Sequence, residues 1–162
     1  MNKIDNRFII LGIVAAVTLV GAVGLAFLFV GQTEPAAAGV LSADSMAYDF
    51  GSIPITGGVV SYVFKISNTG AGNLKLSDIS TSCMCTSVIL ETTDSVSPRF
   101  GMHNNPAFWS KILKKGESAK LIVTFDPMAH GPNAVGPVTR VVRVKTNDSQ
   151  YQTFTITANV VR

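Results

Sequence analysis

The sequence predicts an all-β sandwich of about seven short strands, preceded by one N-terminal transmembrane helix. Three observations lead to this prediction. Residues 8–30 form one uncharged apolar run. From residue 41 onward, short stretches of alternating apolar and polar residues are separated by Gly, Asn, Asp and Pro. Outside the apolar run, no segment repeats its apolar residues strongly at the helical period.

The apolar run reads FIILGIVAAVTLVGAVGLAFLFV and contains 23 residues. At about 1.5 Å per residue, a helix of this length spans about 34 Å, more than the roughly 30 Å of a bilayer core. Lys3 and Arg7 precede the run, and the next positive charge is Lys65. The positive-inside rule therefore predicts that residues 1–7 are cytoplasmic and that residues 31–162 lie outside the cytoplasm, in a periplasmic or extracellular position.

A cleaved signal peptide is the alternative interpretation of this segment. Ala36-Ala37-Ala38 resembles a cleavage site. The apolar region of a signal peptide usually has about 7–15 residues, however, and this one is longer. We therefore expect a retained signal anchor at 8–30, a short linker at 31–40 and an extracytoplasmic domain at 41–162.

The expected strands are justified by the apolar residues that each places on one face, since side chains alternate along a strand. The first strand begins at Ala47 and ends near Gly51 and Pro54. The remaining six are predicted at residues 59–67, 74–79, 86–90, 120–125, 140–145 and 153–161. The inward positions include Val60, Tyr62, Phe64, Ile66, Leu74, Leu76, Ile79, Leu121, Val123, Phe125, Val142, Val144, Phe154, Ile156, Ala158 and Val160. Short alternating strands at this spacing are typical of an immunoglobulin-like sandwich.

Two segments interrupt the rhythm of the strands. Residues 92–113 form a predicted long loop that contains Met102 and His103. Residues 126–137, DPMAHGPNAVGP, form a second loop with Met128 and His130. A long loop without secondary structure is uncommon in a compact domain unless it has a function.

The composition excludes several functional classes. The net charge is only +3, and the Lys and Arg residues are scattered, so the basic stripe with stacking aromatic residues that binds nucleic acid is missing. The sequence also has no HExxH metalloprotease motif and no recognisable nucleophile motif. We therefore expect no enzyme, no nucleic-acid partner and no small-molecule substrate.

Several short motifs follow one another in the strand-rich part of the chain. They are Tyr48-Asp49-Phe50-Gly51, Phe64, Asn68-Thr69-Gly70, Leu74, Ser82-Cys83-Met84-Cys85-Thr86, Lys115-Gly116-Glu117-Ser118, residues 123–127 and Thr146-Asn147-Asp148. In this order they resemble the bacterial DUF1573 family of unknown function. The resemblance covers about residues 46–161 and implies an extracytoplasmic Ig-like module, related to the Hydin-type domains, with no established enzymatic activity. Where that family usually has Cys-Gly-Cys-Thr, this chain has Met84 in place of the glycine.

The two cysteines, Cys83 and Cys85, are the most informative residues for chemistry. Residues i and i+2 of a strand share a face, and two thiols on one face indicate soft-metal or redox chemistry. Thiolates and thioethers favour Cu(I), and thiolates with imidazole also suit zinc. Since loops at one end of a sandwich cluster in space, the sequence predicts a Cu(I) or zinc site built from Cys83, Cys85, Met102, His103, Met128 and His130.

Other interpretations of the same residues stay open. In an extended strand, the Cα atoms of i and i+2 lie about 6.5–7 Å apart, which is at the limit for a disulfide, so a disulfide requires a turn at Met84. An oxidising compartment favours that disulfide. Free thiols are the third alternative. His103 is alternatively a solvated loop residue, and His130 is alternatively a turn cap. The alternative for Met102 and Met128 is packing beneath the loops.

The function predicted from these observations is a membrane-anchored, extracytoplasmic, non-catalytic module that binds a protein partner. Two alternatives involve the cysteines directly. One is the binding or delivery of Cu(I) or zinc, and the other is thiol–disulfide exchange.

Overall fold

The computed structural model describes residues 6–29, 38–147 and 150–162, and within the N-terminal helix it describes the side chains of residues 10–21. The chain divides into two compact units, residues 1–36 and residues 37–162. The first unit contains helix α1 (Asn6–Phe29). Among the described residues, no helix combines the length and the apolar character that a membrane span needs. Residues 31–37, most of the predicted linker, lie outside the described residues, as do residue 30 of the predicted anchor and residues 1–5 of the predicted cytoplasmic segment.

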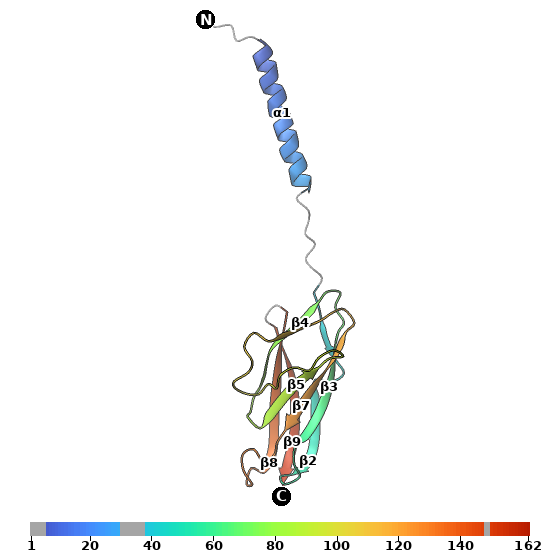
Figure 1. Cartoon of the computed structure of the whole chain (residues 1–162), viewed down its shortest axis with the longest axis vertical. Helices are drawn as coiled ribbons and strands as arrows, with labels where there is room; N and C mark the ends of the chain where they lie inside the picture. The colour runs from blue at the N-terminus through green and yellow to red at the C-terminus, as the bar shows by residue number, and fades with distance from the viewer. Residues whose placement is uncertain (1–5, 30–37, 148–149) are drawn as a thin grey trace. The chain divides into compact units, whose positions relative to one another are not determined.

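The second unit is a β-sandwich of two sheets (Figure 1). The first sheet has four strands in the order β1-β3-β7-β5, and the second has five in the order β2-β9-β8-β4-β6. All paired strands are antiparallel except β2 and β9. The strands are β1 (Leu41–Ala43), β2 (Ala47–Pro54), β3 (Val60–Asn68), β4 (Leu74–Thr81), β5 (Thr86–Glu91), β6 (Ser110–Leu113), β7 (Ser118–Phe125), β8 (Gly136–Thr146) and β9 (Gln150–Val161).

The prediction of an all-β sandwich is confirmed, and all seven predicted strands are present. The structure adds β1 and β6, so the described sandwich has nine strands. Both additions are short and lie at sheet edges, where few apolar residues alternate. Strand β8 also begins at Gly136, four residues before the predicted start at Arg140.

Of the two residues near which the first strand is predicted to end, Gly51 lies within β2 and Pro54 is its last residue. Its pairing with β9 shifts register between Asp49 and Ser52, and Gly51 has a φ of 66°. A glycine adopts this left-handed conformation without steric cost. The glycine therefore forms a bulge within the strand instead of ending it.

The predicted inward faces form the core between the two sheets. Phe64, Phe154, Leu74, Leu121 and Val144 are fully buried and belong to one continuous apolar cluster. In β4, a register shift between Ser77 and Ser80 accompanies the positive φ of Asp78, which explains why Leu76 and Ile79 both face inward.

The predicted loop at residues 92–113 is partly ordered by the sandwich. Its last four residues form β6, which pairs with β4. Phe100 is only 1% exposed, and its backbone NH and carbonyl pair with Val88 of β5 at 2.8 and 2.9 Å. Trp109 packs edge-on against the Phe100 ring, with ring centroids 4.9 Å apart. This segment therefore closes one side of the core.

The pairing registers define two ends of the sandwich. Val60 and Thr86 both pair with Phe125, and Gly136 pairs with Val160, so residues 55–59, 82–85 and 126–135 meet at the end that we call the disulfide end. The opposite end contains residues 38–40, 69–73 and 114–117, and we call it the Asn68 end. The chain enters the sandwich at the Asn68 end, and the C-terminus lies at the disulfide end (Figure 1).

Candidate functional site: a disulfide turn with two nitrogen partners

Cys83 and Cys85 lie in a tight turn between β4 and β5, not on a strand. The amide of Thr86 donates to the carbonyl oxygen of Cys83 at 3.1 Å, which closes a four-residue β-turn. The turn brings the two Cα atoms to 5.2 Å, and the two sulfurs form a disulfide. The prediction that both thiols share a strand face is therefore wrong, whereas the turn that a disulfide requires is present.

Hydrogen bonds that do not involve sulfur also hold this turn. The buried hydroxyl of Thr81 lies 2.9 Å from the carbonyl oxygen of Cys83 and 3.0 Å from that of Thr86. The amide of Asp126 donates to the Cys85 carbonyl oxygen at 2.9 Å and links the turn to the β7–β8 loop. The amide of Ser82 bonds to Val141 of β8 at 2.9 Å. The turn is thus fixed to both sheets by its backbone.

Met84 fits this turn without backbone strain. It does not have a positive φ, so glycine at this position is not required by the backbone conformation. Its side chain is 73% exposed and points away from the core. The turn therefore buries two sulfurs and presents a thioether to solvent.

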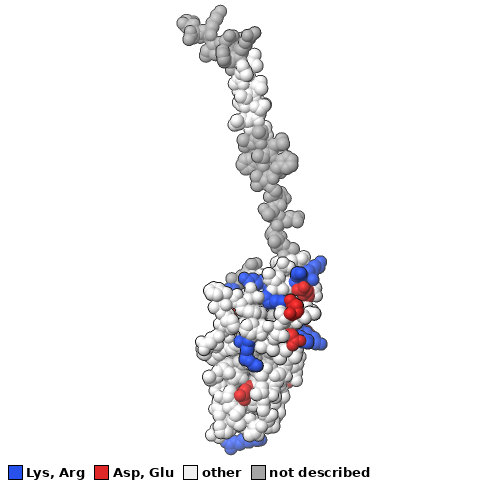
Figure 2. All heavy atoms as spheres, viewed as in Figure 1, with Lys and Arg blue, Asp and Glu red and all other residues white. Residues whose placement is uncertain are grey.

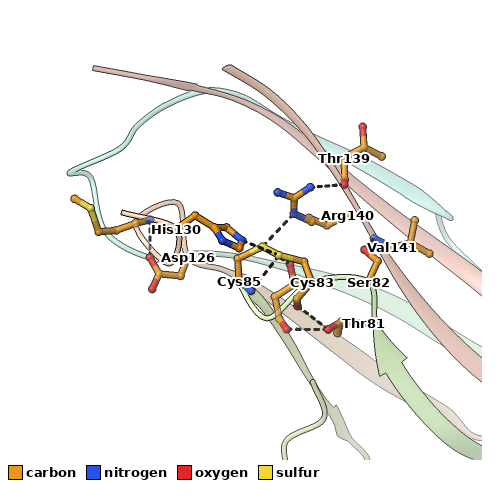
Figure 3. The surroundings of a disulfide bond; sticks show 11 residues. Thr81, Ser82, Cys83, Cys85, Asp126, His130, Thr139, Arg140 and Val141 are labelled. Atoms are coloured by element: carbon orange, nitrogen blue, oxygen red, sulfur yellow. Dashed lines mark hydrogen bonds between the residues drawn. A yellow bond between two sulfur atoms is a disulfide. The ribbon is translucent and has the colours of Figure 1, made fainter. Parts of the chain in front are cut away.

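Each sulfur of the disulfide has a nitrogen partner from outside the turn (Figure 3). Nε2 of His130 lies 3.1 Å from Sγ of Cys83. Nε of Arg140 donates to Sγ of Cys85 at 3.0 Å, and the same guanidinium bonds to the carbonyl oxygen of Thr139 at 2.9 Å. Because the Arg guanidinium is always protonated, a permanent positive charge lies against Cys85.

Only part of the predicted metal-ligand set comes together. One ligand atom each from Cys83, Cys85 and His130 lies within 4.8 Å of the other two. His103 is outside this cluster, and it lines a separate hollow together with Met102, Ser82 and Arg143. Met128 precedes His130 in the same loop, and its side chain is 37% exposed. Of the two loops predicted to join the cysteines, only the loop with His130 does so.

Arg140 is the site residue that the sequence did not reveal. The sequence predicts it at the start of a strand, whereas it lies within β8, and only the register between β4 and β8 places that strand beside the cysteine turn. The pairing of Ser80 with Arg143 and of Thr81 with Val142 continues past the end of β4 to Ser82, which bonds to Val141. Arg140 follows next, opposite the disulfide.

Exposed apolar side chains gather at the disulfide end of the sandwich. Val59 and Met84 line one open hollow of about 370 Å³ with Cys85, Arg99 and Asp126. The exposed fractions of their side chains are 58% and 73%. The β7–β8 loop adds two more exposed apolar residues to this end, Met128 and Val135. We call Val59, Met84, Met128 and Val135 the apolar rim.

The charged groups with a shifted pKa lie away from the disulfide. An ion pair with Lys111 and a hydrogen bond from Thr92 lower the pKa of Asp94 to about 2. The phenol of Tyr151 donates to the carboxylate of Asp78, which raises the pKa of Tyr151. On the face shown in Figure 2, Lys and Arg side chains are dispersed and partly accompanied by acidic groups, without a continuous basic stripe.

The comparisons with known proteins agree with this fold. A crystal structure of a protein of unknown function from Porphyromonas gingivalis W83 superposes with a TM-score of 0.59 at 18% identity over 80% of this chain. The chain spans only 50% of that protein. A likeness at this identity shows the fold alone.

Two further solved structures are more distant. The seventh PapD-like (ASH) domain of human CEP192 has a TM-score of 0.47 at 14% identity, covering 81% of this chain and 91% of that domain. The VesB protease of Vibrio cholerae has a TM-score of 0.48 at 18% identity, covering 74% of this chain and 32% of that protease. No curated protein matches the sequence. The family of HYDIN/CFA65/VesB-like, Ig-like domains matches residues 39–159, and the chain therefore belongs to this family.

Proposed function

We propose that this chain is a non-catalytic interaction module that binds a protein partner through its disulfide end. The observation that carries the proposal is the apolar rim, in which three connections place four exposed apolar side chains at the disulfide end. Burying apolar side chains of this size contributes about 1.5–3 kcal/mol each when burial is complete. Methionine is also enriched at interfaces, and its flexible thioether adapts to irregular surfaces.

The partner that fits this end is a protein with a complementary apolar surface. The rim is interrupted by polar groups, including Arg99 and Asp126, which line the hollow beside Met84. A mixture of apolar anchors and peripheral charges is typical of protein interfaces. The disulfide end also lies opposite the Asn68 end, where the chain enters the sandwich at residue 38. A tether that precedes residue 38 therefore joins the Asn68 end and not the disulfide end.

We further propose that residues 8–30 anchor the chain in the cytoplasmic membrane, with residues 1–7 in the cytoplasm and the sandwich outside it. This proposal is supported by the uncharged run of 23 residues and the positive charges that precede it. Alkaline extraction of membranes tests it, since an anchored chain stays in the pellet. A soluble mature chain that begins near Gly39 would indicate a cleaved signal peptide instead.

Within its family, we propose that the chain is one of the bacterial DUF1573 domains. The proposal is supported by the ordered motifs from Tyr48-Asp49-Phe50-Gly51 to Thr146-Asn147-Asp148.

Site-specific photocrosslinking of the full-length chain in membranes tests the docking surface. A crosslinker at Met84 should yield a discrete adduct with one protein, whereas a crosslinker at Ile112 should not. Ile112 is a matched control because it is 52% exposed and lies on β6, which pairs with β4 near the Asn68 end. Equal adducts from both positions, or none from Met84, would contradict the proposal.

Metal binding is a second candidate function, supported by the proximity of Cys83, Cys85 and His130. Two thiolates and one imidazole form a plausible coordination set for Cu(I) or, with a fourth ligand, for zinc. Both sulfurs must first be reduced, since they are joined in the disulfide. Titration of the reduced full-length chain with Cu(I) or zinc tests this function. Affinity that is weaker than micromolar, or unchanged in the Cys83→Ser, Cys85→Ser double variant, would contradict it.

A further inference from the structure

We infer that the Cys83–Cys85 disulfide is exchange-active and oxidises a thiol pair on the docked protein, with Cys83 as the attacked sulfur and Cys85 as the leaving sulfur. The inference rests on the proposed docking surface only for the nature of the partner. The chemistry itself follows from the surroundings of the two sulfurs.

Two independent observations distinguish the sulfurs. Cys83 is 9% exposed and Cys85 is 3% exposed, so an incoming thiolate has better access to Cys83. The guanidinium of Arg140 donates to Cys85, which stabilises negative charge on that sulfur. A sulfur leaves faster when its negative charge is stabilised, so both observations favour attack at Cys83.

The proposed exchange proceeds in two balanced steps. A partner thiolate attacks Sγ of Cys83, the disulfide breaks, and its electron pair stays on Cys85 as a thiolate beside Arg140. The second partner thiolate then attacks the partner sulfur of the mixed disulfide and releases Cys83 as a thiolate. The partner leaves with a new disulfide after losing two electrons, and this chain gains those electrons as two thiolates.

The position of the disulfide in the chain is consistent with exchange and not with a structural crosslink. The two cysteines are only two residues apart, and the stabilisation from a disulfide increases with the length of the loop that it closes. Both cysteines belong to one turn, so the bond does not join the sheets. The hydrogen bonds of Thr81, Thr86 and Asp126 hold the turn without the sulfurs, so we expect the site to stay formed after reduction.

The equilibrium with glutathione tests the role of Arg140. The full-length chain is solubilised in detergent and equilibrated in glutathione redox buffers, and the reduced fraction is read by thiol alkylation. In Arg140→Met, the reduced form should become about tenfold less favourable, which corresponds to about 30 mV for a two-electron couple. Arg143→Met is the matched control, because Arg143 lies on the same strand and the substitution removes the same charge. This variant should change the equilibrium less than twofold. Equal shifts in both variants would overturn the role of Arg140.

The sequence itself offers a test of which sulfur is attacked. Cyanogen bromide cleaves after methionine, and Met84 separates the two cysteines into fragments 47–84 and 85–102. After brief reaction with glutathione and acid quenching, mass spectrometry should find glutathione on fragment 47–84. Glutathione mainly on fragment 85–102 would overturn the assignment. A disulfide that glutathione does not reduce would overturn exchange as a whole. These readouts use a small thiol, so they remain valid even if no protein docks at the apolar rim.

Discussion

Asn68 donates from Nδ2 to the carbonyl oxygen of Leu113 at 2.9 Å, across 45 residues of sequence. The same amide nitrogen bonds to Gly72 at 2.8 Å, and Oδ1 accepts from the amides of Val40 and Gly70, both at 3.0 Å. The Asn68 side chain is fully buried. One amide group therefore joins three segments at the end where the chain enters the sandwich: the entry at Val40, the β3–β4 connection and the end of β6.

Asn68→Ala should reduce the free energy of unfolding by about 2–4 kcal/mol, because it leaves several backbone groups without their partner. Urea unfolding measures the loss. Asn73→Ala is the control, since Asn73 is exposed and lies in the same connection, and it should have little effect. Comparable losses in the two variants would show that Asn68 does not organise this end.

Phe100→Ala should reduce the free energy of unfolding by about 3–5 kcal/mol, because it creates a cavity in the core. Phe108 lies in the same segment but is fully exposed, so Phe108→Ala should change stability by less than about 0.5 kcal/mol. Thermal or urea unfolding of both variants makes the comparison. If the two variants had equal effects, the segment before β6 would not close the core as described.

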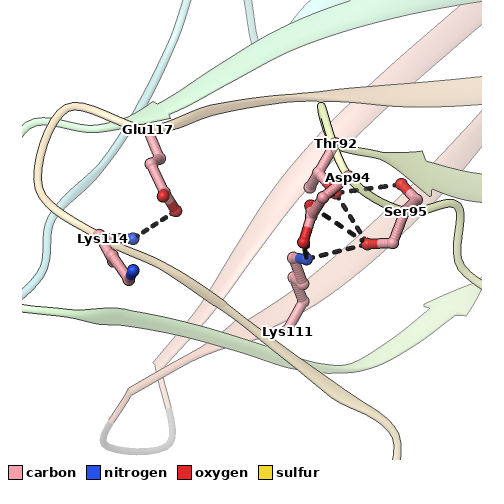
Figure 4. A network of polar contacts seen from close by, with 6 residues as sticks. All are labelled: Thr92, Asp94, Ser95, Lys111, Lys114 and Glu117. Atoms are coloured by element: carbon pink, nitrogen blue, oxygen red, sulfur yellow. Dashed lines mark hydrogen bonds and ion pairs between the residues drawn. The ribbon is translucent and has the colours of Figure 1, made fainter.

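Asp94 is held by Lys111 and Thr92 in an exposed network (Figure 4). Its pKa of about 2 lies below the ordinary value near 3.8. The network therefore stabilises the fold above about pH 4, and this contribution is lost as the pH falls through about 2. We expect the effect on stability to be small because the carboxylate is exposed.

Carboxyl chemical shifts followed by NMR check this assignment directly. The Asp94 carboxyl should titrate near pH 2 in the parent chain and at a higher pH in Lys111→Met, because the ion pair is then lost while the hydrogen bond from Thr92 still lowers the pKa. An unchanged midpoint in the variant would show that Lys111 does not cause the shift.

The sequence predicts much of the sandwich because strand alternation is a local property. Val60 to Ile66 and Phe154 to Val160 alternate clearly, and both segments bury the expected faces. Strand β6 and Phe100 were missed because their pairing depends on distant strands and leaves no local period. The bulge at Gly51 resembles a strand end in sequence, since glycine serves both purposes.

The site is less predictable than the fold for the same reason. Cys83 and Cys85 are recognisable from their spacing, and His130 from its residue type. Whether His103 or His130 reaches the sulfurs depends on how each loop leaves its strand, which the sequence does not encode locally. The register of β8 against β4 brings Arg140 to the disulfide, and an arginine within a strand has no distinguishing sequence pattern.

The most direct test of the proposed exchange with a protein docked at the disulfide end is to trap the mixed disulfide in membranes. In Cys85→Ser, the thiolate of Cys83 can attack the disulfide form of the partner, which is the product of the proposed exchange. One partner sulfur leaves as a thiolate, and because Cys85 is missing, only that partner thiolate can break the mixed disulfide again. We predict one adduct that a reductant removes, formed with the same protein that crosslinks to position 84, and far less adduct in Cys83→Ser. Equal adducts from both variants, or no adduct that is sensitive to reductant, would contradict the account.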